Sequence, residues 1–236
     1  MRLSESLFCT LLKDGKGFIS ITGGGGKTTL LTLLGRECAK QGCSVLLTTA
    51  TKVASPYLHD YKADIIFEDE SILGYVPEKG KVVFYAEHHT LDMKKWIAPR
   101  EEIISALASR FDVVISEADG SKGLPLKIHT ERDPVIYSGT TAVIAVMGLW
   151  GIGEKAYSYA FGEDRDVIID KDYLQWYISS AEGLSKGFAD NNVILFNGAE
   201  NVSDETIRML FSLDYPENTT IYAASEKEDR IYGLVF

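Results

Sequence analysis

Short apolar segments alternate with amphipathic segments along most of the chain. The apolar segments have the length of buried strands, and apolar residues in the segments between them recur with the period of a helix. The pattern predicts strands at residues 18–22, 44–48, 63–67, 82–86, 111–116, 142–147, 192–197 and 219–224. It predicts helices at residues 4–12, 27–41, 100–110, 172–180 and 203–211.

This order of elements indicates an α/β fold. Strands that alternate with helices form a mainly parallel sheet with helices on both faces, which gives three layers. A chain of 236 residues that is 45% hydrophobic can bury a sizeable core, and it contains no repeat or low-complexity linker. We therefore expect a single domain over residues 1–236, with a core at about 15–200 and an extension of the sheet at about 201–236.

A glycine-rich turn lies between the first predicted strand and the first long helix. Its residues are Gly23, Gly24, Gly25, Gly26, Lys27, Thr28 and Thr29. Glycines without a Cβ can adopt positive φ and direct successive N–H groups at one anion. Lys27 would then contact the β- and γ-phosphates, the Thr28 hydroxyl would bind Mg²⁺, and the helix N-terminus would favour negative charge. The turn predicts a P-loop and, with it, a three-layer fold like that of P-loop NTPases.

The loop departs from the full Walker pattern, G-x-x-x-x-G-K-[ST], because Ile21 stands in place of the first glycine. Partitioning and metal-insertion ATPases use K-G-G-x-G-K-T-T, and Mur-type ligases use G-[TS]-x-G-K-T-T. Thr22 occupies the position of the lysine that the partitioning ATPases extend across a dimer, so that mechanism is not expected here. A plain glycine turn is the alternative, but the strand before the loop and the helix after it favour phosphate binding.

An apolar strand that ends in carboxylates is the second chemical feature. Glu117 and Asp119 follow the strand at 111–116 and are two positions apart, so on an ideal strand they share a face. The segment resembles a Walker B element, in which an acidic group positions Mg²⁺ or the attacking nucleophile. We expect Glu117 and Asp119 to act with Lys27 in catalysis and with Thr28 in binding Mg²⁺, although Mg²⁺ needs only one or two protein carboxylates. An ordinary solvated strand end is the alternative.

Two further polar segments follow strands at the same edge of the sheet. Lys52 ends a polar run at 48–52, from which it could reach the γ-phosphate; an ordinary strand-to-loop junction is the alternative. The long loop at 120–134 is rich in basic residues, which are Lys122, Lys127, His129 and Arg132. Long loops in compact domains are often functional, so this loop suggests an anionic ligand, with a solvated loop as the alternative.

Composition excludes several other functions. The formal charge of −10 argues against a nucleic-acid partner, because phosphate contacts need clustered Lys and Arg. The three cysteines form no C-x-x-C motif, which is typical of a reducing compartment. No apolar run approaches the ~20 residues of a membrane span, and no signal peptide is recognisable. We therefore expect a cytoplasmic protein without a membrane partner.

Four segments in order resemble the YqeC-type proteins, which are accessory proteins of selenium-dependent molybdenum hydroxylases. They are T-G-G-G-G-K-T-T at 22–29, T-A-T-K at 49–52, E-A-D-G-S-K-G-L-P-L-K at 117–127 and E-R-D-P-V-I at 131–136. The resemblance covers about residues 15–200, and the third segment is the most specific. It implies nucleotide binding at residues 23–29, Glu117 and Asp119. It departs at 160–165, where A-F-G-E-D-R replaces an expected H-R-P-E.

The resemblance implies an NTPase that uses Mg²⁺ and ATP, or else GTP, to help mature a molybdenum hydroxylase or its cofactor. Two alternatives stay open. One is a Mur-type ligase that activates a carboxylate as an acyl phosphate, although such ligases are much longer. The other is a nucleotide switch without turnover, in which bound nucleotide orders the 120–134 loop for a partner protein.

Two features near strand ends bear on the nucleotide base. Asn197 stands where G-protein-like NTPases carry Asn-Lys-x-Asp, but Gly198 and Glu200 replace the lysine and aspartate, so guanine specificity is not expected. Asn197 could still touch a base, although a strand-ending Asn-Gly turn is favoured. Trp150 and the aromatic residues that alternate at 157–161 are interpreted as strand or core packing rather than as a platform for a base.

Overall fold

The computed structural model describes residues 1–87 and 94–235. His88 and His89, which the sequence places in a surface loop rather than in a metal site, lie outside these ranges. No helix in the described ranges is long and apolar enough to cross a membrane.

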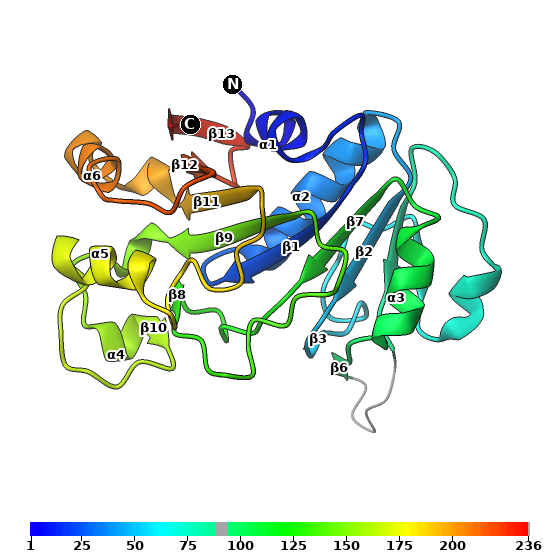
Figure 1. Ribbon diagram of the computed structural model, residues 1–236, viewed down its shortest axis with the longest axis horizontal. Helices are drawn as coiled ribbons and strands as arrows, with labels where there is room; N and C mark the ends of the chain where they lie inside the picture. The colour runs from blue at the N-terminus through cyan, green and yellow to red at the C-terminus, as the bar shows by residue number, and fades with distance from the viewer. Residues whose placement is uncertain (88–93, 236) are drawn as a thin grey trace.

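Within the described residues, nine strands form one sheet that runs through the molecule (Figure 1). In spatial order its strands are β13 (Arg230–Val235), β12 (Thr219–Ser225), β11 (Asn192–Asn197), β9 (Ala142–Gly148), β1 (Gly17–Gly23), β7 (Val113–Glu117), β2 (Val45–Thr49), β5 (Val82–Tyr85) and β4 (Ile65–Phe67). All neighbouring pairs are parallel except β12 with β13, which is antiparallel. The predicted mainly parallel sheet is therefore confirmed.

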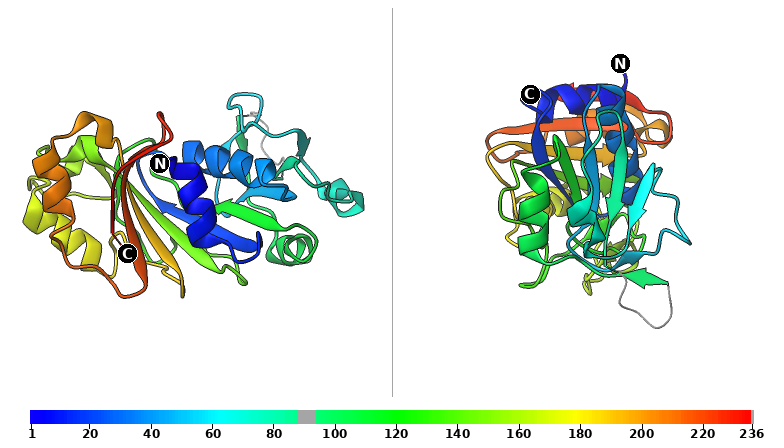
Figure 2. Two further views of the ribbon diagram at one scale, coloured as in Figure 1. Left: turned by 90° about the horizontal axis from the view of Figure 1, so that it is seen from above. Right: turned by 90° about the vertical axis from the view of Figure 1, so that its right-hand side faces the viewer.

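The helices lie on both faces of the sheet. They are α1 (Leu3–Leu11), α2 (Lys27–Lys40), α3 (Glu101–Ala108), α4 (Ala156–Tyr159), α5 (Lys171–Ser179) and α6 (Asp204–Leu210). Figure 2 shows the α1–α2 pair and the α5–α6 group on opposite sides of the central strands. This arrangement confirms the three-layer α/β fold that the alternation of strands and helices predicts.

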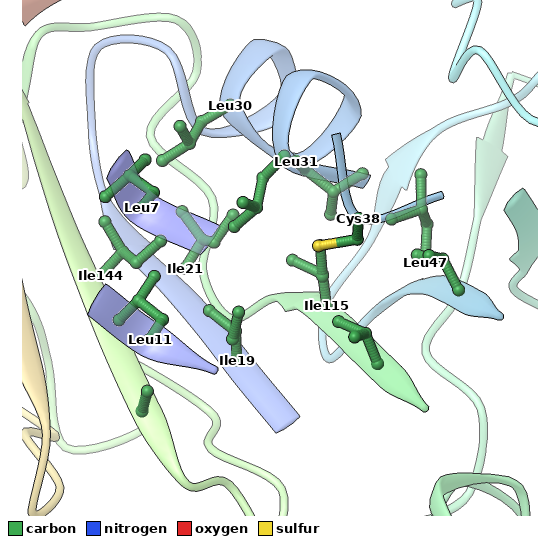
Figure 3. Close-up of a cluster of buried hydrophobic side chains, with 14 of the residues drawn as sticks. Leu7, Leu11, Ile19, Ile21, Leu30, Leu31, Cys38, Leu47, Ile115 and Ile144 are labelled. Atoms are coloured by element: carbon green, nitrogen blue, oxygen red, sulfur yellow. The ribbon is translucent and has the colours of Figure 1, made fainter. Parts of the chain in front are cut away.

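In the part of the chain that the structure describes, three apolar clusters fill the spaces between the layers. The largest packs α1 and α2 against one face of the central strands, and Figure 3 shows Leu7, Ile21 and Leu30 meeting there. A second packs α5 and α6 against β9, β11 and β12, and a third packs α3 against β2, β5 and β7. Successive residues of a central strand face opposite layers, so β9 contributes Ile144 to the first cluster and Ala145 to the second.

The predicted elements agree with the structure to within about two residues at most ends, as expected for patterns of this length. The sequence pattern missed the C-terminal strand β13 and two short ribbons. One ribbon joins β3 (Val53–Ala54) to β6 (Lys95–Trp96), and the other joins β8 (Leu126–Lys127) to β10 (Ala160–Phe161). Two-residue strands carry no readable periodicity, which explains why these were missed.

The aromatic residues predicted to pack as strand or core are only partly buried. Tyr157 lies in α4 and is exposed, and Trp150, in a 3₁₀ turn at Leu149–Gly151 directly after β9, is 48% exposed. The interpretation of these two residues as core was therefore wrong. Trp150 therefore presents a half-exposed indole at the end of β9.

Candidate functional site

The glycine-rich turn lies at the carboxyl end of β1, in the middle of the sheet. β1 ends at Gly23, and α2 begins four residues later at Lys27. Gly23, Gly25 and Gly26 all have positive φ, and a Cβ on Gly23 would lie 2.2 Å from the carbonyl oxygen of Val146 on β9. Only glycine fits where the turn passes so close to a neighbouring strand.

Three of the four glycine N–H groups donate within the protein. Gly23 donates to the Asp119 carboxylate at 2.8 Å, Gly24 to the Val146 carbonyl at 2.9 Å, and Gly25 to the Leu124 carbonyl at 3.0 Å. The next four N–H groups, those of residues 26–29, have no acceptor among the described residues. An anion at this helix N-terminus would therefore be held by residues 26–29 rather than by all four glycines.

Lys27 lies inside the turn and is only 4% exposed. Its ammonium donates to the Gly23 carbonyl at 2.6 Å and to the Ser121 hydroxyl at 3.3 Å. It also lies 3.1 Å from Oδ1 of Asp119 and 4.0 Å from Oε1 of Glu117. The lysine is thus held at the turn by a carbonyl and two carboxylates, which leaves its charge beside the open N–H groups.

Glu117 and Thr28 form the pair that faces the cleft. The Thr28 hydroxyl donates to Oε2 of Glu117 at 2.8 Å. Burial raises the pKa of Glu117, and the Lys27 charge with the Thr28 hydrogen bond offsets only part of that increase. A hydroxyl and a carboxylate are both hard oxygen ligands, so Thr28 and Glu117 fit Mg²⁺.

Asp119 is fully buried, and its partners differ from those of Glu117. Oδ2 of Asp119 accepts from Gly23 and from Nε2 of His129 at 2.7 Å, while Nδ1 of His129 lies 2.9 Å from the Gly183 carbonyl. Burial alone would raise the pKa of Asp119, but the His129 hydrogen bond and the Lys27 charge lower it below its usual value. Asp119 is therefore an ionised carboxylate that fixes the turn from behind.

The sequence predicts the same roles for Glu117 and Asp119, but the structure gives the two carboxylates different surroundings. Glu117 lines the cleft in front of the turn, whereas Asp119 is enclosed by Gly23, Lys27 and His129. No cluster of three His, Cys, Asp or Glu suited to a metal occurs in residues 1–87 and 94–235.

A cleft of about 400 Å³ opens in front of the turn. Its lining includes residues 25–29, Glu117, Lys52, His59 and Lys122. Lys122 itself has positive φ, and its ammonium lies 4.9 Å above the ring of Phe161. The position predicted for Lys52, at the same edge as the turn, therefore brings it to this cleft.

The basic loop at 120–134 is mostly folded into the protein rather than free. Lys127 is buried and pairs with Asp133 at 2.5 Å, and His129 is buried against Asp119. The Leu124 carbonyl caps Gly25, so the loop touches the glycine turn directly. Among the basic residues singled out there, Lys122 is the one that lines the cleft, whereas Lys127 and His129 have structural partners.

Two residues at the turn were not expected from the sequence in these roles. Asn197, at the end of β11, donates to the Gly25 carbonyl at 2.8 Å and accepts from the Glu226 N–H at 3.0 Å. The Glu226 carboxylate lies beside Gly26, where a Cβ would be 2.3 Å from Oε2. Asn197 could be noticed as a polar strand end, but Glu226 carries no sequence signal because it follows a strand far along the chain.

The fold and this site define a three-layer α/β protein with a glycine turn and a strand-end carboxylate at the centre of its sheet. A family model described as "YqeC protein" matches residues 19–161, more than half of the chain. The chain therefore belongs to the YqeC family. The matched segment contains the turn, Glu117, Asp119 and His129, but not Asn197 or Glu226.

A curated relative supports the same family. The chain is 36% identical over 140 residues to "Uncharacterized protein YqeC" of Escherichia coli strain K12. The match covers 58% of this chain and 54% of that protein, so it spans about half the length of the relative. No solved structure matches the chain.

Proposed function

We propose that the protein binds and hydrolyses a nucleoside triphosphate with Mg²⁺, with ATP favoured over GTP. The observation that carries this proposal is the row of open N–H groups at residues 26–29 beside the Thr28–Glu117 pair. Backbone donors at a helix N-terminus suit phosphate, and the hydroxyl and carboxylate suit the metal that accompanies it.

Each residue then has a distinct part. The N–H groups of 26–29 hold phosphate oxygens, and Lys27, kept in place by Asp119, neutralises charge on the transferring group. Thr28 and Glu117 would hold Mg²⁺, which when bound neutralises phosphate charge. Lys52 reaches the same cleft and adds positive charge where the terminal phosphate would lie.

The biological role that we propose is help in maturing selenium-dependent molybdenum hydroxylases. It rests on the resemblance of residues 22–29, 49–52, 117–127 and 131–136 to the YqeC-type accessory proteins. The partner would be a hydroxylase or its molybdenum cofactor. Co-purification of such an enzyme with the protein, in a nucleotide-dependent manner, tests this part separately.

A nucleotide switch without turnover is the second candidate, favoured by the contact between Gly25 and Leu124. The Gly25 N–H belongs to the turn, and its acceptor belongs to the loop at 120–134. A phosphate that drew the Gly25 N–H toward itself would release Leu124, so binding could change the loop conformation. Tight nucleotide binding with negligible phosphate release would favour this candidate over the hydrolase.

The first test is a calorimetric titration of ATP and GTP with and without Mg²⁺, in parallel with phosphate release. We expect Thr28→Val to remove the effect of Mg²⁺ on ATP affinity, because the variant keeps its shape and N–H but loses the hydroxyl ligand. Thr32→Val, one turn further along α2, is the matched control, since the Thr32 hydroxyl donates to the Thr29 carbonyl and, among the described residues, to no other group. Metal-dependent ATP binding by Thr28→Val equal to that of the wild type would contradict the assignment.

Lys27→Ala tests the charge at the turn. We expect loss of triphosphate binding or of turnover, because the cation beside the phosphate is removed. Since Lys27 also pairs with the buried Asp119, thermal unfolding of the variant should be measured alongside. Turnover at the wild-type rate by a folded Lys27→Ala protein would show that this lysine does not serve the reaction.

A further inference from the structure

Two acidic side chains lie after the carboxyl ends of β11 and β12, and neither has a role in the phosphate and Mg²⁺ binding proposed above. Glu226 follows β12 and is only 5% exposed, and its Oε1 has no hydrogen-bond partner among the described residues. Oε2 of Glu200, which lies after β11 and close enough to affect Glu226 electrostatically, is likewise buried without a partner. A buried polar atom without a partner costs about 1–3 kcal/mol, so such atoms require an explanation.

The position of Glu226 is fixed by the turn. Its N–H donates to Asn197, and the same Asn197 side chain donates to the Gly25 carbonyl. Its Oε2 lies only 2.3 Å from the point where a Cβ would stand at Gly26, so the carboxyl packs directly against the turn. The Glu226 carboxyl is therefore held beside Gly26, the first residue of the open N–H groups, and it is not among the residues that line the cleft with Glu117 and Lys52.

An aromatic ring lies against the same strand ends. The Trp150 indole packs on Gly148, where a Cβ would be 2.5 Å from the ring, and it lies 3.4 Å from the corresponding point on Gly198. Gly198 directly follows Asn197. Because both contacted residues are glycines, the ring lies close to the backbone of β9 and β11 while 48% of the residue remains exposed. An exposed indole held in this way offers a face on which a planar group can stack.

We propose that the ends of β9, β11 and β12 form the subsite for the heterocyclic base of the nucleotide, with Trp150 as the stacking surface and Glu226 as the hydrogen-bonding partner of its edge. This inference rests on the proposed function, because the phosphates at residues 26–29 bring the base here. A base would offer a flat aromatic face for the Trp150 indole to stack on. It would also offer N–H donors at its edge to the Glu226 carboxyl group.

The state of Glu226 suggests which base is preferred. Burial, with the nearby charge of Glu200, raises the pKa of Glu226 well above its usual value. A neutral carboxyl group donates one hydrogen bond and accepts another. The pairing edge of adenine offers an amino donor beside a ring-nitrogen acceptor, which matches this arrangement. Guanine offers its O6 acceptor beside N1–H, which one carboxyl group can also pair, but it adds a 2-amino donor that the same carboxyl group leaves unpaired. We therefore expect ATP to bind better than GTP.

The test compares Mg²⁺-ATP with Mg²⁺-tripolyphosphate, which shares the phosphates but has no base. In Trp150→Leu we expect ATP affinity to fall roughly 5- to 100-fold while tripolyphosphate affinity stays within about twofold of the wild type. Trp150→Phe keeps an aromatic ring and should retain most of the ATP affinity. Tyr157→Leu, at an equally exposed aromatic residue on α4, is the matched control and should change neither affinity.

Glu226 is tested with two variants. Glu226→Gln keeps one donor and one acceptor and should keep the preference for ATP, whereas Glu226→Leu should lose it. A purely structural Glu226 predicts instead that the leucine variant is as stable as the wild type or more so and binds ATP unchanged. Unchanged ATP binding by folded Trp150→Leu and Glu226→Leu proteins that still bind tripolyphosphate overturns the base subsite alone. A wild-type protein that binds neither ligand overturns the proposed function as well.

Discussion

At the scale of single residues, two carboxylates on one short segment have opposite environments. Glu117 is the last residue of β7 and faces the cleft beside Thr28, whereas Asp119 is enclosed by hydrogen-bond donors. Their pKa values move in opposite directions, upward for Glu117 because of burial and downward for Asp119, where the His129 hydrogen bond and the Lys27 charge outweigh burial. The side of Glu117 that lines the cleft suits a ligand. Asp119, which accepts from Gly23 and His129 and pairs with Lys27, suits support of the turn.

The buried contact between Asp119 and His129 gives the first residue-scale prediction. We expect His129→Leu to lower the free energy of unfolding by about 2–4 kcal/mol, because Asp119 then loses one of its donors inside the protein. Urea unfolding measures this cost. A double-mutant cycle with Asp119→Asn should give a coupling of about 1–3 kcal/mol. Equal costs of His129→Leu in both backgrounds would mean that the two side chains act independently.

At the scale of elements, the close approach of β1 to β9 dictates the turn. Gly23 is paired with Val146 in the parallel register and is followed at once by the residues that leave the sheet. A parallel strand pair so near a turn leaves no room for a side chain, so the glycine here is required by packing as well as by its φ of 91°.

A comparison of two glycines tests this argument. Gly23 and Gly42 have similar φ, 91° and 87°, but a Cβ on Gly42 would have no atom of the described residues within 4 Å. Gly42→Ala should therefore cost only the backbone strain, about 1–2 kcal/mol. Gly23→Ala should cost at least about 3 kcal/mol, because the Val146 carbonyl must also move. Urea unfolding curves of the two variants measure these losses in the free energy of unfolding. Equal losses would show that β1 and β9 can move apart at little cost.

At the scale of the whole molecule, the two ends of the chain meet at α1. Asp229, between β12 and β13, accepts from the Ser4 N–H at 2.7 Å and from the Ser4 hydroxyl at 2.9 Å. It also accepts from Arg2 at 2.8 Å, and the Asp229 carbonyl accepts from the Leu3 N–H. A residue from the C-terminal region thus caps the first helix, and Figure 1 shows α1 beside β13.

Removal of this cap should be measurable as a change in stability. We expect Asp229→Ala to lower the free energy of unfolding by about 1–2 kcal/mol, since the first turn of α1 loses its acceptor. Asp229→Asn keeps an acceptor oxygen and should lose less than half of that, because the exposed pair with Arg2 contributes little by itself. If thermal unfolding shows the asparagine variant to be as unstable as the alanine variant, the charge and not the cap is what matters.

Much of the site could be predicted from the sequence, for reasons that are local. The turn at 23–26, Lys27, Thr28 and the carboxylates at 117 and 119 are adjacent to the strands that place them, so the order of elements is enough to bring them to one edge. His129, Leu124 and Glu226 could not be placed in this way. Their contacts join segments far apart in the chain, and no period or motif encodes those contacts.

The amino-acid sequence by itself determined the three-layer fold, because periods of two and of 3.6 assign strands and helices and alternation assigns a parallel sheet. It also determined the chemistry of the turn, since glycines, Lys27 and Thr28 are consecutive. Only the tertiary structure decided that Glu117 faces the cleft and that the N–H groups of residues 26–29 remain open. It also brought Trp150 and Glu226 to the strand ends beside the glycine turn. These outcomes depend on burial and on long-range hydrogen bonds, which exist only once distant strands are neighbours.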